Sequence, residues 1–150
     1  MKKLFFASLL MFATICLFAQ TIGKVQQDGN TFTTYDKNGK KITSQSMPSQ
    51  KLIGVGYDFF LLQSGTNYTT LDANFKQIGR ASFPNTEGIG VGNDFFVLKL
   101  RTTFTTYDSK MKKISHVSVG GAVSGTVSGD IFTVNLANSK QRYDKNCRAK

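Results

Sequence analysis

The sequence predicts an all-β protein made of tandem four-stranded antiparallel units, and three observations support this fold class. Residues 53–88 and 89–124 are copies of one 36-residue unit, which begins IGVGYDFF in one copy and IGVGNDFF in the next. Seven of the nine acidic residues recur at that spacing in two series, Asp36, Asp72, Asp108 and Asp144, and Asp58, Asp94 and Asp130. Short runs rich in threonine, valine and aromatic residues alternate with turns of glycine, asparagine and aspartate, as strands and their connections do. A fixed period of this size is typical of a propeller or a solenoid.

Residues 1–19 are expected to be a cleaved signal peptide outside the fold. Two lysines precede an almost wholly apolar run, and Ala19 offers a small residue for cleavage. The run of about 15 residues is shorter than the roughly 20 that a membrane-spanning helix needs. Cys16 raises lipid modification as an alternative, but Ile15 stands where a lipoprotein signal has a small residue. We therefore expect an exported chain, periplasmic or extracellular, with no transmembrane segment after cleavage.

Residues 20–150 are expected to form a single β-repeat domain, which is long enough to bury a core of its own. Its repeats span about 20–52, 53–88, 89–124 and 125–150. After cleavage Cys147 is the one remaining cysteine, so an internal disulfide is impossible and a harmless unpaired thiol is the simplest interpretation. Cys147 and the single His116 cannot assemble a Cys/His metal site within one chain.

The first half of each unit is predicted to be a hairpin of unequal strands. The first strand is thin and glycine-rich, at 53–56, 89–92 and 125–128. Such a strand suits a place where backbones approach closely. A two-residue turn leads to the second and most apolar strand, at 59–62, 95–100 and 131–136. A run without polar alternation indicates a strand that is covered on both faces.

The second half of each unit is predicted to be a hairpin around an aspartate turn. The third strand, at 31–36, 67–72, 103–108 and 140–144, is rich in threonine and aromatic residues. The fourth strand follows at 41–47, 77–83 and 113–119. Between them, sequences such as DKNGK place one carboxylate where it can accept backbone N–H groups two residues on. We assign both aspartate series this structural role, because a calcium loop would need several carboxylates per turn.

Four antiparallel strands per unit, with a thin first strand and a core-like second strand, describe a propeller blade. The pattern over about residues 22–148 resembles bacterial β-propeller repeat proteins and, more loosely, WG-type repeats. The first copy lacks its opening strand and the last lacks its fourth, so about three and a half blades are expected. The resemblance implies that these blades close as a small ring or by dimerisation, since an incomplete ring leaves strand edges open. A β-solenoid is the alternative fold.

The sequence predicts neither catalysis nor a cofactor. His116 is not repeated in the other units, which favours a surface residue. The glycine pairs at 54/56 and 90/92 lack the third glycine and the helix of a nucleotide-binding loop. A small glycan hydrolase is one alternative, if aspartates of neighbouring units came together in a groove.

The chain is strongly basic, with a formal charge of +10, and its cations are not scattered. Four of them close the aspartate turns at one phase of the repeat, namely Lys40, Lys76, Lys112 and Arg148. A rim of this kind would attract polyanions, and for an exported protein an acidic glycan or lipopolysaccharide fits better than nucleic acid. We therefore expect a non-catalytic binding or scaffold module of the cell envelope. The alternative is a structural subunit that associates with itself, as a homodimer, or with another envelope protein through open strand edges.

Overall fold

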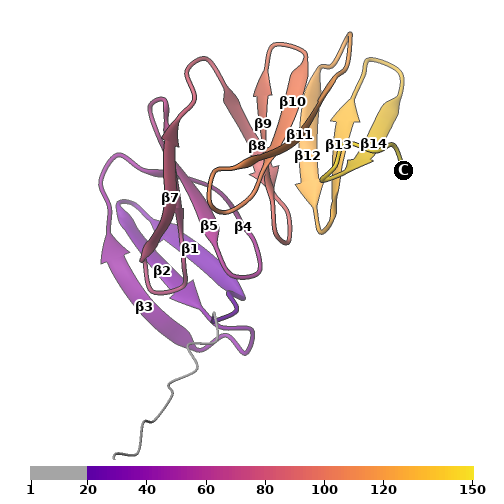
Figure 1. Ribbon diagram of the computed structural model, residues 1–150. Coiled ribbons are helices and arrows are strands. Elements are labelled where there is room, and N and C mark those ends of the chain that lie inside the picture. The colour runs from indigo at the N-terminus through magenta and orange to yellow at the C-terminus, as the bar shows by residue number, and fades with distance from the viewer. Residues whose placement is uncertain (1–19) are drawn as a thin grey trace, which may run out of the picture.

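The computed structural model describes residues 20–150, in which fourteen β-strands form four antiparallel sheets (Figure 1). The predicted signal peptide, residues 1–19, lies outside the described residues. In the described part of the chain, no helix is long and apolar enough to cross a membrane.

The four sheets follow one another along the chain, and each is built from consecutive strands. The first contains β1 (Lys24–Asp28), β2 (Thr31–Tyr35) and β3 (Lys41–Ser46). The second contains β4 (Lys51–Val55), β5 (Phe60–Ser64), β6 (Asn67–Leu71) and β7 (Gln77–Ser82). The third contains β8 (Glu87–Val91), β9 (Phe96–Leu100), β10 (Thr103–Tyr107) and β11 (Lys113–Ser118). The fourth contains β12 (Ser124–Ser128), β13 (Ile131–Asn135) and β14 (Lys140–Asp144).

This arrangement confirms the predicted all-β class and the predicted order of strands, with an incomplete sheet at each end. The opening strands β4 and β8 begin two residues earlier than predicted. Their pairing with β5 and β9 contains a register shift, between Leu52 and Gly54 and between Gly88 and Gly90. The bulge lets pairing continue on both sides of the shift, so each strand reaches back to Lys51 or Glu87.

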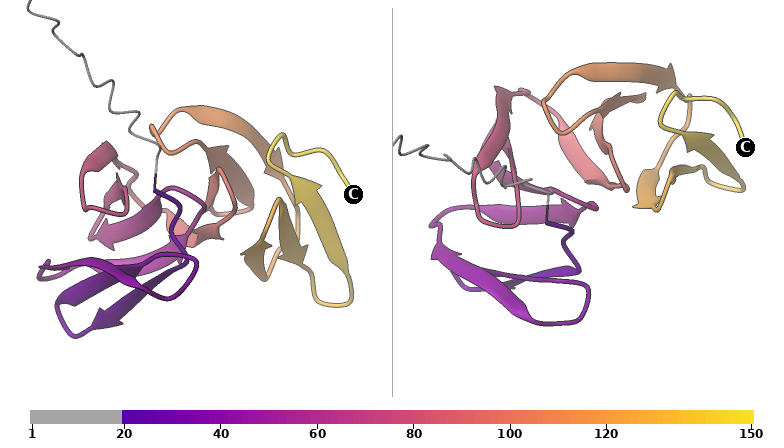
Figure 2. Two further views of the ribbon diagram at one scale, coloured as in Figure 1. Left: turned by 90° about the horizontal axis from the view of Figure 1, so that it is seen from below. Right: turned by 60° about the horizontal axis from the view of Figure 1, so that its bottom comes forward.

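The sheets stand side by side as blades in an open arc, with the first and fourth sheets at opposite ends (Figure 2). The chain alone therefore does not form the small closed ring that was one of the two predicted closures. The β-solenoid alternative is also wrong, because each repeat folds into an antiparallel sheet of its own rather than one coil of a stack.

The core consists of three apolar layers, one between each pair of successive sheets. Strand β5 and the residue before it show how they are filled: Phe60 and Leu62 pack in the layer toward the first sheet, and Phe59 and Leu61 in the layer toward the third. All four side chains are fully buried. The prediction that the second strand is covered on both faces is thus confirmed for the two middle sheets.

Glycines bring the inner strands of neighbouring sheets into direct backbone contact. A Cβ on Gly92 would lie 2.6 Å from the carbonyl oxygen of Gly129, and one on Gly56 would lie 2.9 Å from that of Asn93. At the same place the Asn93 N–H donates to the Gly129 carbonyl at 3.0 Å, and the Tyr57 N–H donates to the Asn93 carbonyl at 2.9 Å. The thin strands are glycine-rich because a side chain here would separate the sheets.

A buried threonine on each of β2, β6 and β10 forms a second link between sheets. Thr34 Oγ1 donates to the Ala73 carbonyl at 2.7 Å, and Thr70 Oγ1 donates to the Ser109 carbonyl at 2.5 Å. Thr106 Oγ1 donates to the Lys145 carbonyl at 2.6 Å. Each hydroxyl therefore holds the aspartate turn of the next sheet.

Candidate functional site

The four aspartate turns of the first series have one geometry. In each, the aspartate Oδ1 accepts the backbone N–H groups two and four residues later, over 2.8 to 3.0 Å. The residue three places after the aspartate has a left-handed backbone: Gly39, Phe75, Met111 and Cys147. The N–H groups of Arg148 and Asn146, and the Lys150 ammonium, hold the pKa of Asp144 below its usual value.

The second aspartate series lies at the same ends of the strands as the first. Strand direction alternates, so the turn after the first strand and the turn after the third strand of a sheet share one end, which we call the turn rim. Contacts between sheets agree with this: Asn93 Nδ2 donates to Asp130 Oδ1 at 2.8 Å, and Lys145 bonds the carboxylate of Asp94. The Asp94 carboxylate raises the pKa of Lys145. All seven repeated aspartates therefore occupy turns.

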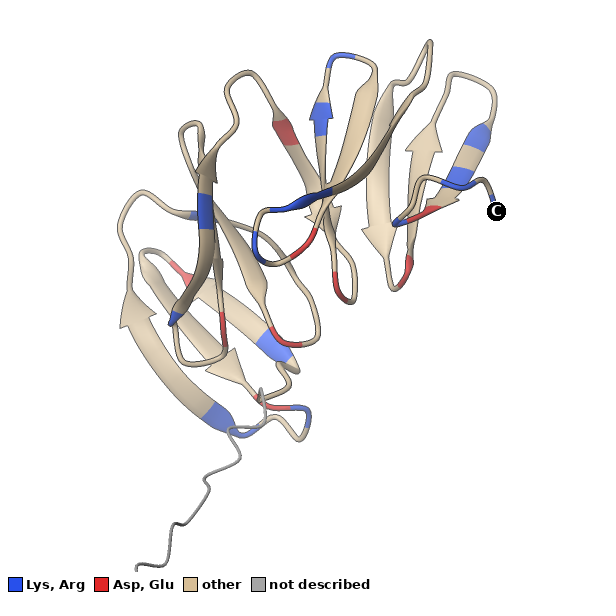
Figure 3. Cartoon of the chain, in the orientation of Figure 1, with Lys and Arg blue, Asp and Glu red and all other residues tan. Residues whose placement is uncertain are grey.

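The predicted polyanion-binding cations also lie on the turn rim, all of them exposed: Lys40, Lys76, Lys112 and Arg148. The rim is not uniformly basic, because the same turns carry the seven aspartates, and acidic and basic positions alternate along it (Figure 3). The opposed charges shorten the reach of the positive potential. Polyanion binding at these four residues stays a prediction.

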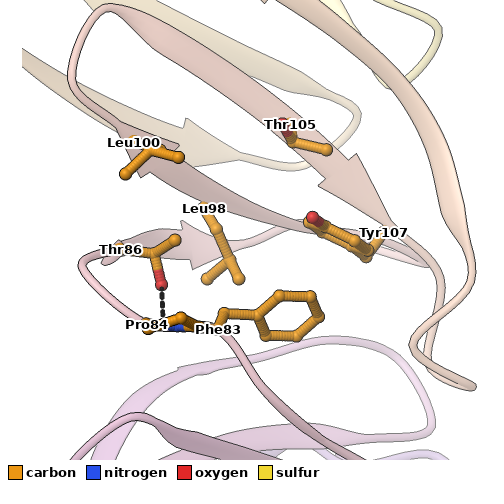
Figure 4. A pocket seen from close by; sticks show the side chains of 7 residues that line it. All are labelled: Phe83, Pro84, Thr86, Leu98, Leu100, Thr105 and Tyr107. Atoms are coloured by element: carbon orange, nitrogen blue, oxygen red, sulfur yellow. Dashed lines mark hydrogen bonds between the residues drawn. The ribbon is translucent and has the colours of Figure 1, made fainter.

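A groove between the second and third sheets is the feature of the surface that the sequence did not reveal. Its apolar part, a hollow of about 240 Å³, is lined by Phe83, Pro84, Thr86, Leu98, Leu100, Thr105 and Tyr107 (Figure 4). It continues into a shallower hollow of about 710 Å³ beside Asn85 and Arg101. We call these two hollows together the inter-sheet groove. It lies at the ends of the strands opposite the turn rim, where β7 connects to β8.

The walls of the inter-sheet groove are held in place by local contacts. The rings of Phe83 and Tyr107 are 4.8 Å apart, and Tyr107 stacks in turn on Phe96 at 5.3 Å. Thr86 Oγ1 donates to the Phe83 carbonyl at 2.8 Å and fixes the connection around Pro84. Burial raises the pKa of the Tyr107 hydroxyl.

Leu100 gives the groove an apolar residue that water reaches, with 45% of its surface exposed. The corresponding residue in the second sheet is Ser64. A sequence signal was therefore present, since the apolar run of the second strand extends to Leu100 in the third unit and stops earlier in the second. An exposed leucine beside a hollow with aromatic walls suits the docking of an apolar side chain.

The other residues considered from the sequence lie apart from this groove. His116 is exposed on β11, and the glycine pairs belong to the inner strands. Cys147 lies in a turn, where burial raises the pKa of its thiol. Among residues 20–150, no three His, Cys, Asp or Glu side chains gather closely enough to hold a metal ion.

Comparison with known proteins supports the fold. No family model and no curated protein matches the sequence. Several solved structures are similar to this chain. Hsv2 of Kluyveromyces lactis aligns with a TM-score of 0.59 at 14% identity, over 84% of this chain and 42% of its own. The N-terminal domain of Nup159 aligns with a TM-score of 0.53 at 16% identity, over 84% of this chain and 39% of its own.

A bacterial structure, BamB from Moraxella catarrhalis, aligns with a TM-score of 0.51 at 12% identity, over 87% of this chain and 48% of its own. The chain thus spans less than half the length of these three proteins. All three are β-propellers. Four consecutive blades and these alignments together show that the described residues have the β-propeller fold, as an open arc rather than a closed ring.

Proposed function

We propose that this chain is a non-catalytic binding or scaffold module of the cell envelope and that its ligand is a protein segment. The single observation that carries this proposal is the inter-sheet groove, in which the exposed Leu100 and the Phe83 and Tyr107 rings together offer an apolar contact. The envelope location rests on the predicted signal peptide.

The chemistry of the groove indicates what it would hold. A hollow of about 240 Å³ with aromatic, leucine and proline walls has room for one or two apolar side chains. Arg101 stands at its edge and favours an acidic neighbour in the same segment. A propeller of similar fold, Nup159, has been solved bound to dbp5, and the same mode of use is proposed here.

Selection of peptides from a random displayed library against the purified protein, followed by titration, tests this function. We expect enriched peptides to carry a bulky apolar residue beside an acidic one, and Leu100→Asp to weaken their binding at least about tenfold, which is 1.4 kcal/mol. Val123→Asp is the matched control, because Val123 is also exposed, at 65%, but lies outside the groove. Peptides that bind both variants equally well would refute the assignment of the groove.

Polyanion binding on the turn rim is the second candidate, and the shared position of Lys40, Lys76, Lys112 and Arg148 supports it. Retention on a heparin column that falls with salt, and falls further when all four are changed to glutamine, is the expected result. Unchanged retention of that variant would exclude the rim. Binding to a polyanion and binding of a peptide in the groove are separable, because the two surfaces lie at opposite ends of the strands.

A further inference from the structure

The outer faces of the first and fourth sheets, which no other sheet of residues 20–150 covers, differ systematically from the faces between sheets. We call them the first end face and the last end face. We infer that both are built as water-facing caps, so that the chain works as an open four-bladed arc and does not stack end to end on a second copy. This inference does not depend on the proposed function.

On the first end face, β1 lacks the two apolar residues with which the corresponding strands of the other sheets face a preceding sheet. In the other three sheets one phase of the repeat holds a fully buried ring, Phe60, Phe96 or Phe132. The same phase in the first sheet is Lys24, which is exposed, and its Nζ lies over the Tyr35 ring at 6.0 Å. Two residues on, Leu62, Leu98 and Val134 are buried, and the first sheet has exposed Gln26. Lys24 Nζ also donates to Gln26 Oε1 at 3.2 Å, so β1 presents polar side chains on this face.

The last end face has changed in the same direction. Toward a following sheet, the second and third sheets present Leu61 and Val97, and the fourth presents Thr133. On the third strand the buried Tyr68 and Phe104 correspond to exposed Lys140. Figure 3 shows cations on β1 of the first sheet and on β14 of the last. Stacking of two copies would take the cations of both faces out of water. The desolvation of an unpaired charge is unfavourable.

The hydroxyl link between sheets also stops at the last end face. Thr34, Thr70 and Thr106 each donate to a turn of the next sheet. The same phase in the fourth sheet is Arg142, which is exposed. A second copy placed against this face would therefore receive no such hydrogen bond.

In the first sheet, the aspartate turn also lacks the apolar side chain that the other sheets place against a preceding sheet. Phe75, Met111 and Cys147 take a left-handed backbone, and each packs in the apolar layer toward the preceding sheet. Within the described part of the chain no sheet precedes the first one, and its residue at this position is Gly39, around whose Cβ position there is nothing within 4 Å. Where no packing offsets the strained conformation, glycine adopts it without cost.

All these changes follow the rule for terminal repeats of stacked proteins, which need polar outer faces to stay soluble. This chain aligns with less than half of each similar propeller, so a ring of that size would need about two copies. The caps oppose that closure. They leave the inner strands β4, β8 and β12 beside an open concave side instead of a closed channel.

Light scattering after gel filtration tests the inference on the purified protein and two variants. We expect the mass of one chain for the wild type. We expect a mass of two chains or more, rising with concentration, for a variant that restores the interior residues on both faces, Lys24→Phe and Gln26→Leu with Thr133→Val and Arg142→Thr. The matched control, Lys76→Phe with Gln77→Leu, adds the same apolar residues at exposed positions away from both end faces and should stay a single chain.

Two results would overturn the inference. One is a wild-type dimer that Lys24→Glu or Arg142→Glu separates into single chains. The other is a restored variant that folds, as judged by circular dichroism, and still has the mass of one chain. A wild-type dimer that neither charge reversal disturbs would place self-association at another surface, such as a strand edge, and would support the caps.

Discussion

Phe75, Met111 and Cys147 adopt a left-handed backbone although each carries a side chain. That conformation costs about 1 to 2 kcal/mol for a residue other than glycine. The Phe75 ring offsets the cost by packing edge-on against Phe60, with centroids 5.5 Å apart. The turn therefore uses a side chain as a wedge between sheets wherever a preceding sheet exists, and Gly39 where none does.

Cys147 provides a prediction for alkaline pH. Burial raises the pKa of its thiol above the usual 9.0, with Ser115 and Thr106 opposing the shift. Between the unfolded and folded pKa values the unfolded chain has lost a proton that the folded chain retains, so the free energy of unfolding falls as pH rises through about 9 and above. Burial raises the pKa of Tyr107 as well, which extends the decline upward from 10.0.

Urea unfolding at several pH values between 7 and 10 measures this decline. We expect Cys147→Ala to be less stable than wild type at pH 7, because it removes packing, but to lose less stability between pH 8 and 10. Parallel pH dependences of the two proteins would show that the thiol does not contribute.

At the scale of the elements, two neighbouring threonines on β2, one buried and one half-buried, show how the first sheet attaches to the second. Thr34 is fully buried and bonds the Ala73 carbonyl, whereas Thr33 points to the outer face and is half-buried. These neighbours have the same chemistry and different surroundings. They therefore separate the strand propensity of threonine from the link between sheets.

Thr34→Val is expected to destabilise the protein by about 1 to 3 kcal/mol, because it leaves the Ala73 carbonyl without its donor in a buried place. Thr33→Val, the matched control, is expected to change stability by less than about 0.5 kcal/mol. Urea unfolding at pH 7 gives both values. Equal effects of the two substitutions would mean that the hydroxyl link does not hold the sheets together.

At the scale of the whole molecule, the two middle sheets are packed on both faces and the two end sheets on one. Stability within a protein follows the number of buried contacts that must open. The middle of the arc should therefore be the last part to open, and the outer strands β3 and β14 among the first.

Hydrogen exchange followed by mass spectrometry is expected to show the slowest amides in β5 and β9 and clearly faster exchange in the first and fourth sheets. The reason is that Phe60 and Leu61 on β5, and Phe96 and Val97 on β9, are fully buried, so the hydrogen bonds of these strands should open last. Equally slow exchange in the end sheets would indicate that another surface covers them in solution, contrary to the inferred caps.

Much of this architecture was readable from residues that recur every 36 positions, because a strand and a tight turn depend on local chemistry. The double-faced apolar strands, the aspartate turns and the incomplete end units were all predictable in this way. The inter-sheet groove was not, because its walls come from the connection around Pro84 on one sheet and from Leu100 and Tyr107 on the next.

The sequence by itself determined the repeat, the strand order and the all-β class, since each of these is encoded within one unit. Only the tertiary structure decided which face of each strand meets which neighbour, and therefore that Lys24 and Arg142 stand where interior sheets have Phe60 and Thr70. It also placed both aspartate series on one rim with the four candidate cations. The physical reason is that burial and charge neighbourhood are properties of two packed sheets, which no single repeat contains.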